Sequence, residues 1–93
     1  MEAGRTPNEV LKVAATSKPV SVAGAIAGVI RTQSRVEIHA IGAGALNQAI
    51  KAIAISRGYL APAGVEVVCI PSFIDLSLGG QERTGIRLLV EVR

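Results

Sequence analysis

The sequence predicts an α+β domain with the element order β-α-β-α-β-β, in which two helices pack on one face of a four-stranded mixed sheet. Two segments that alternate in hydrophobicity, Glu9–Ala15 and Arg35–Ile41, flank a segment with helical periodicity. A second helical segment then leads to two long strand-like segments joined at Gly79-Gly80. Because the helices and the strands each carry an apolar face, stacking them in two layers buries those faces together.

The first strand, Glu9–Ala15, ends at a turn that leads into the first helix. We expect the helix to begin at Pro19, because proline has no N–H group to leave unpaired in the first turn and its φ angle suits a helix. Apolar side chains then recur at helical spacing, at Val22, Ala25, Ile26, Val29 and Ile30. Ala23-Gly24 and Ala27-Gly28 form a strip of small residues that would let another backbone approach closely. The two internal glycines each disfavour a helix by about 1 kcal/mol, so their presence suggests close packing.

The second strand, Arg35–Ile41, alternates between an apolar face and a face that carries Glu37 and His39. The apolar face consists of Val36, Ile38 and Ala40. A strand-helix-strand unit of this length forms a right-handed crossover between parallel neighbouring strands. We therefore expect both helices to begin at the same end of the sheet.

The second helix, within Gly42–Gly58, follows a glycine-rich turn and ends where Arg57 precedes Gly58, a common helix stop. Helical spacing predicts a core face of Leu46, Ala49, Ile50 and Ile53. The opposite face is only partly polar and consists of Gln48, Ala52 and Ile55. We expect this second face to contact another copy of the chain in a homodimer or homotetramer. The alternative is that Ile55 is simply an exposed apolar residue.

Two long strands, Val65–Leu78 and Glu82–Arg93, follow the second helix and are expected to form a hairpin around Gly79-Gly80. A Gly-Gly pair adopts the positive φ angles that a tight hairpin turn requires. Pro71 lacks the N–H group that a central strand needs, so its strand is expected at a sheet edge or with a bulge.

Residues 1–8 are polar and lack periodicity, so we expect a flexible N-terminal tail, followed by a single domain over residues 9–93. Cys69 is the only cysteine in the sequence. Because no charged leader is followed by an apolar segment and a cleavage site, we expect no export signal. No apolar segment is long enough to cross a bilayer. We expect a cytoplasmic protein without a membrane partner.

The residues that could carry enzyme chemistry are few and scattered. His39 is the one histidine and lies on a half-buried strand, where histidines are usually structural. Cys69 lies among apolar residues and has no metal-ligand spacing. The Gly42-Ala43-Gly44 turn lacks the third glycine of a dinucleotide loop. We therefore expect no enzymatic activity, no cofactor and no metal site.

The charge of the chain permits a polyanion partner. Ten Lys and Arg residues against seven Asp and Glu give a formal net charge of +3. If both helices begin at one end of the sheet, their positive dipole ends lie on one surface. The candidate phosphate-binding residues on that surface are Lys18, Gly42, Ala43, Gly44, Asn47 and Lys51. Because aromatic residues that could stack on bases are almost absent, we expect binding to the phosphate backbone.

Three segments carry a family resemblance: SKPVSVAGAIAGVIR, EIHAIGAGALNQAIKAIAISRGYLAPAGVEVVCIPSF and ERTGIRLLVE. They resemble the bacterial stage V sporulation protein S family from about Val10 to Arg93, most specifically in AIGAGALNQAIKA. That family is in turn similar to the Alba-type chromatin proteins, which implies an Alba-like fold. The resemblance also implies that Lys18, the Gly42–Gly44 turn and the hairpin tip with Arg83 contact nucleic acid.

Two departures from the Alba pattern, a second turn without arginine and Glu82 before Arg83, imply either weaker, more salt-sensitive binding or a changed ligand. The leading hypothesis is a small nucleic-acid-binding regulator that contacts mainly the phosphate backbone. The alternative is a structural or signalling adaptor that uses the same fold for protein contacts, because a net charge of +3 is low for a chromatin protein.

Overall fold

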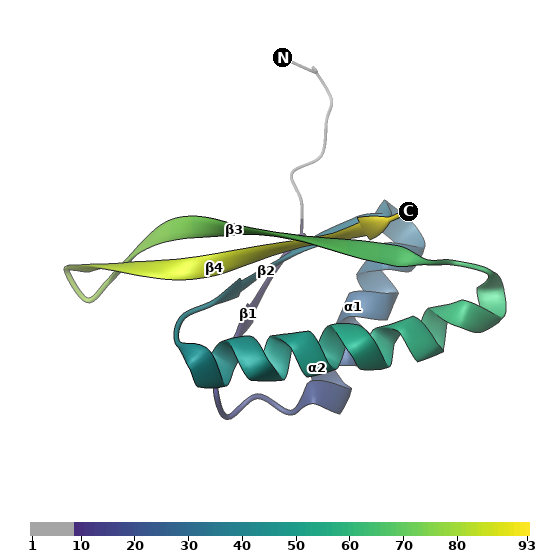
Figure 1. Ribbon diagram of the computed structural model, residues 1–93, viewed down its shortest axis with the longest axis horizontal. Helices are drawn as coiled ribbons and strands as arrows, with labels where there is room; N and C mark the ends of the chain where they lie inside the picture. Colours follow the sequence, from purple (N-terminus) through teal and green to yellow (C-terminus); the bar gives the residue numbers. More distant parts are fainter. Residues whose placement is uncertain (1–8) are drawn as a thin grey trace, which may run out of the picture.

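The computed structural model describes residues 9–93 and confirms the predicted element order. Its elements are β1 (Glu9–Val13), α1 (Pro19–Gln33), β2 (Arg35–Ala40), α2 (Ala43–Leu60), the short 3₁₀ helix η1 (Ala61–Ala63), β3 (Val67–Leu78) and β4 (Gln81–Val92). Both helices lie on one face of a four-stranded mixed sheet (Figure 1), which is the Alba-like α+β fold that the sequence implies. The predicted tail, residues 1–8, lies outside the described residues.

The strand order in the sheet is β1-β2-β4-β3. β1 and β2 are parallel, as the predicted crossover requires, whereas β4 is antiparallel to both β2 and β3. β3 is therefore an edge strand, which confirms the position predicted from Pro71. The register between β3 and β4 continues without interruption through Pro71, which lies opposite Leu88, so the strand accommodates proline without a bulge.

The core lies between the helices and the apolar face of the sheet. The predicted period-2 alternation is confirmed, because the buried strand residues include Val36, Ile38, Ala40, Leu88 and Val90. The buried residues of α1 are Ala23, Ile26, Ala27 and Ile30. The opposite face of the sheet, which we call the open face, carries the alternate residues of the same strands, among them Glu37 and His39.

Helix α2 is buried along a face that helical spacing predicted only in part. Its buried residues are Ala45, Ala49, Ala52, Ile53, Ser56 and Leu60. Ile50, predicted in the core, is 48% exposed, and Ala52, predicted on the opposite face, is fully buried. The prediction is wrong at these two positions because α2 lies directly against α1, and alanines allow a closer approach of the two helix axes than isoleucine does.

The alanines of α1, rather than its glycines, form the close contact with the rest of the chain. Ala23 and Ala27 are fully buried. Gly24 and Gly28 are exposed, and a Cβ atom added at either position would meet no atom of the described chain within 4 Å. Within residues 9–93, the predicted strip of small residues is therefore buried at Ala23 and Ala27, whereas no close approach is found at Gly24 and Gly28.

The β3–β4 hairpin extends beyond the rest of the sheet (Figure 1). β4 pairs with β2 only from Ile86 to Glu91, whereas residues 81–85 pair only with β3. The φ angles of 57° at Gly79 and 79° at Gly80 confirm the predicted tight turn. We call residues 74–85 the arm. Because β4 is antiparallel to β2, the arm projects from the end of the sheet at which β2 ends and α2 begins.

Candidate functional site

The starts of both helices lie together at the end of the sheet from which the arm projects. β1 and β2 are parallel, so α1 and α2 follow the same ends of their strands. The side-chain Nε2 of Gln48 donates a hydrogen bond of 2.9 Å to the backbone oxygen of Ser17. A Cβ atom added at Gly44 would lie 3.0 Å from the Cβ atom of Ala15. The segments that lead into α1 and α2 are therefore in contact, as the predicted crossover requires.

Neither helix start is capped by a side chain. Lys18 is the extended N-cap residue of α1, and Gly42 is the N-cap residue of α2 with a φ angle of 90°. Neither first turn contains an acidic residue. The unpaired N–H groups of the two first turns, together with the helix dipoles, therefore present partial positive charge at one end of the molecule. Such helix starts bind phosphate oxygens well.

Four arginines form ion pairs with Glu37, Glu66 and Glu91, whereas the lysines have no ion pair within residues 9–93. Ion pairs join Arg35 to Glu91 at 3.0 Å, Arg87 to Glu37 at 2.9 Å, Arg57 to Glu66 at 3.7 Å and Arg93 to Glu66 at 2.8 Å. The cationic side chains without an ion pair within residues 9–93 include Lys12, Lys18, Lys51 and Arg83. The positive charge that remains available to a partner is therefore carried mainly by lysines.

Asn47 and Lys51 are both exposed and share one face of α2, because they are four residues apart. Lys51 lies about 12 Å along the helix axis from Ala43, at a rise of about 1.5 Å per residue. Lys51 is therefore more than two turns behind the helix start. A polyanion bound at Lys18 reaches Lys51 only if it continues along α2.

Arg83 is exposed on the arm and does not join Lys18 on one face. By the alternation of β4, Arg83 shares its face with Arg87, on the open side of the sheet. The other face of the arm carries Asp75 and Glu82. Because these carboxylates repel phosphate, the arm is a poorer surface for a polyanion than the two helix starts are.

The residues predicted to contact a second copy face largely into the chain. Gln48 donates a hydrogen bond to the backbone oxygen of Ser17, Ala52 is fully buried, and Ile55 is half-buried against the core. Ala52 therefore offers no surface to another molecule. The large apolar side chains that α2 and β3 do expose include Ile50 and Phe73, the latter 80% exposed.

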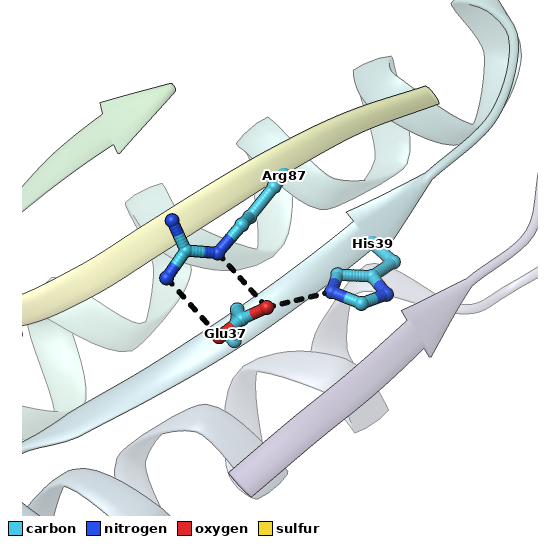
Figure 2. A network of polar contacts seen from close by, with 3 residues as sticks. All are labelled: Glu37, His39 and Arg87. Atoms are coloured by element: carbon cyan, nitrogen blue, oxygen red, sulfur yellow. Dashed lines mark hydrogen bonds and ion pairs between the residues drawn. The ribbon is translucent and has the colours of Figure 1, made fainter. Parts of the chain in front are cut away.

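Figure 2 shows Glu37 of β2 between Arg87 of β4 and His39 of β2 on the open face. Glu37 Oε1 accepts a hydrogen bond from His39 Nε2 at 2.8 Å and forms an ion pair with Arg87 Nε at 2.9 Å, and Glu37 Oε2 accepts a hydrogen bond from Arg87 Nη2 at 3.2 Å. The hydrogen bond to Glu37 raises the pKa of the Arg87 guanidinium. Sequence reasoning missed this network because its central pair depends on the register between β2 and β4.

The described part of the chain holds no cluster of three or more His, Cys, Asp or Glu side chains that could bind a metal ion. Burial raises the pKa of the Cys69 thiol, which lowers the fraction of reactive thiolate at a given pH. As for the membrane, no helix in residues 9–93 combines the length and hydrophobicity that crossing one requires.

The family model described as Stage V sporulation protein S (SpoVS) matches residues 9–93. The match covers every helix and strand described above, including the two helix starts and the arm. It is the same family that the three sequence segments resemble.

Proposed function

The chain belongs to the stage V sporulation protein S family, a bacterial family associated with sporulation, and we propose that it is a small regulatory protein that binds nucleic acid. In this proposal the ligand is held mainly by its phosphate backbone. The binding surface consists of Lys18, the Gly42-Ala43-Gly44 turn, Asn47 and Lys51, with Arg83 at its margin.

One observation supports this proposal above the others: two uncapped helix starts are joined in a single surface. The hydrogen bond from Gln48 to Ser17 joins the two starts, and the exposed Lys18 adds a full positive charge at the start of α1. Backbone N–H groups and lysines recognise phosphate oxygens without reading base edges. Binding is therefore expected to be nearly independent of sequence.

The binding is expected to be modest. The turn before α2 contains no arginine, and the arm carries Asp75 and Glu82 beside Arg83. With few phosphate contacts, the affinity is low even at low salt, and it falls further as the salt concentration rises. The near absence of aromatic residues also disfavours the stacking type of single-strand binding.

Fluorescence anisotropy with labelled duplex DNA and structured RNA at low salt tests the proposal. We expect duplexes of unrelated sequence to bind with similar affinity, and Lys18→Gln to weaken all of them several-fold. The matched control is Arg31→Gln, which removes one exposed charge from the last turn of the same helix, at its other end. If neither DNA nor RNA binds, or if the two variants have equal effects, the proposed surface is wrong.

A second candidate function, a protein-binding adaptor, is favoured by the exposed edge strand β3. Val68, Ile70 and Phe73 are exposed on this strand, whose outer edge has no partner strand within residues 9–93. Such an edge can add a strand from another chain. An adaptor predicts that nucleic acid fails to bind at low salt, and that Phe73→Glu prevents a protein contact without lowering stability.

A further inference from the structure

A cavity of about 370 Å³ lies where β1 and β2 end and the arm continues. Its walls come from three parts of the chain: the end of β1 and the connection to α1, the end of β2, and the arm. Most of the lining is apolar and includes Val13, Ile41 and Leu76. The volume falls within the range of small-molecule sites. Nothing in the proposed nucleic-acid surface uses this cavity.

The polar groups of the cavity are few and distinct. Lys12 lines the cavity, is exposed and has no ion pair within residues 9–93. Ser77 of the arm adds a hydroxyl group. The ring of His39 forms part of the wall, and its hydrogen bond to Glu37 fixes its orientation (Figure 2). Because Arg87 in turn holds Glu37, this wall is rigid before any ligand binds.

Gly85 shapes the apolar end of the cavity. It is buried within β4, and a Cβ atom there would lie 3.0 Å from the oxygen of Ala40, 3.0 Å from Cγ1 of Ile41 and 3.3 Å from Cδ1 of Leu76. A methyl group at this position would therefore crowd Ile41 and Leu76, two of the cavity walls, which would have to shift by a few tenths of an ångström. A glycine inside a strand often marks such a close approach.

From this arrangement we propose that the cavity is a binding site for a small aliphatic carboxylate. The aliphatic body lies against Val13, Ile41 and Leu76. The carboxylate faces solvent, where Lys12 supplies the opposite charge and Ser77 a hydrogen-bond donor. An apolar lining together with Lys12, which has no ion pair within residues 9–93, matches an amphipathic anion better than a phosphodiester, which has no apolar end to bury.

Titration of the full chain with hexanoate, followed by ¹H–¹⁵N NMR, tests the site. We expect saturable shifts of the backbone amides of Val13, Ile41, Leu76 and Ser77. Hexan-1-ol, which has the same aliphatic chain without the charge, is expected to bind about tenfold more weakly, and hexylamine more weakly still. Between butanoate and hexanoate, each buried methylene should raise the affinity about fourfold.

Two variants and one control locate the ligand. Lys12→Gln is expected to weaken hexanoate binding about tenfold. Lys51→Gln makes the same charge change on the exposed face of α2 and should leave the affinity unchanged. Gly85→Ala should weaken butanoate, hexanoate and hexan-1-ol together, because the added methyl group crowds Ile41 and Leu76, two of the cavity walls.

Three results would overturn this proposal. In the first, no saturable shifts appear at the cavity residues. In the second, hexanoate and hexan-1-ol bind equally, or Lys12→Gln and Lys51→Gln have the same effect. In the third, the cavity amides shift on dilution of the ligand-free protein together with a change in molecular mass, which would assign the cavity to a second copy of the chain.

Discussion

At Gly42 the backbone conformation that connects β2 to α2 depends on a single residue. Its φ angle of 90° lies where residues with a side chain are rarely found, and it is the N-cap of α2. Gly24 lies inside α1 with open space around it and an ordinary helical conformation. Replacement by alanine is therefore expected to change the stability of the fold in opposite directions at the two glycines.

Gly42→Ala is expected to lower the free energy of unfolding by more than about 1 kcal/mol, because alanine is strained at this φ angle. Gly24→Ala should raise it by about 1 kcal/mol, because alanine is the better helix former and nothing blocks its methyl group. Urea denaturation of the two variants measures both changes. If the two variants change stability in the same direction, the strain assigned to Gly42 is wrong.

Cys69 should react slowly in the folded chain. Burial raises the pKa of its thiol, so at any pH below that pKa the folded chain contains less thiolate than the unfolded chain. The rate of alkylation by iodoacetamide, plotted against pH, should therefore be displaced to higher pH relative to the chain in urea. A folded chain that reacts along the same pH curve as the urea-unfolded chain would contradict this expectation.

Single residues could be predicted from the sequence where the reason is local. The Gly79-Gly80 turn and the edge position of Pro71 follow from φ angles and from a missing N–H group, and the structure confirms both. Gly85 was not predicted, because its role depends on Ile41 and Leu76, which the register of the arm brings to it. An isolated glycine in a strand is a signal that could have found it.

At the level of elements, the pairing of β2 with β4 is strengthened by the network around Glu37. Only 15% of the Glu37 side chain is exposed, whereas Glu91, which pairs with Arg35 between the same strands, is more exposed at 26%. When a carboxylate that is largely removed from water is replaced, its partners, here including Arg87 and His39, lose their ion pair or hydrogen bond.

We expect Glu37→Gln to lower the free energy of unfolding by about 2 kcal/mol. Glu91→Gln should lower it by less than about 1 kcal/mol, because its ion pair is better solvated. Thermal and urea denaturation at neutral pH compare the two. If both variants lose the same free energy of unfolding, burial does not determine how much the network contributes to stability.

The elements themselves were predictable, but the rotation of α2 about its axis was not. Val36, Ile38 and Ala40 alternate with polar residues, so period 2 determined the buried face of β2. In α2, alanine and isoleucine occur on every side, and the choice between Ile50 and Ala52 depended on the close contact with α1. Helical spacing alone does not predict how closely α1 and α2 approach each other.

At the scale of the whole molecule, self-association remains a prediction. Because Ile55 is half-buried against the core, whereas Ile50 and Phe73 are exposed, we now expect the contact at Ile50 and Phe73. Ile50→Glu and Phe73→Glu are each expected to reduce the mass measured by sedimentation at tens of micromolar, because a carboxylate is costly to bury in an interface. Both side chains are exposed, so the fold should keep its stability. Val20→Glu, at an exposed apolar residue of α1, is the matched control. A wild-type chain that sediments as a monomer would end the idea.

The arrangement of the candidate site was predictable in outline. The strand-helix-strand order implied parallel β1 and β2, and hence two helix starts at one end. The sequence did not show that Gln48 joins those starts, nor that Arg83 and the acidic pair Asp75 and Glu82 lie on opposite faces of the arm. Both facts depend on tertiary contacts and on register.

The most direct test of the central proposal is the salt dependence of duplex DNA binding. If Lys18 and Lys51 of each chain in a dimer contact phosphates, the slope of log association constant against log salt should be about −4, since each contact contributes about 0.9. Lys18→Gln should reduce the slope to about −2, and Arg31→Gln should leave it unchanged. A wild-type slope near zero, or equal slopes for the two variants, would contradict the assignment of the joined helix starts as the phosphate-binding surface.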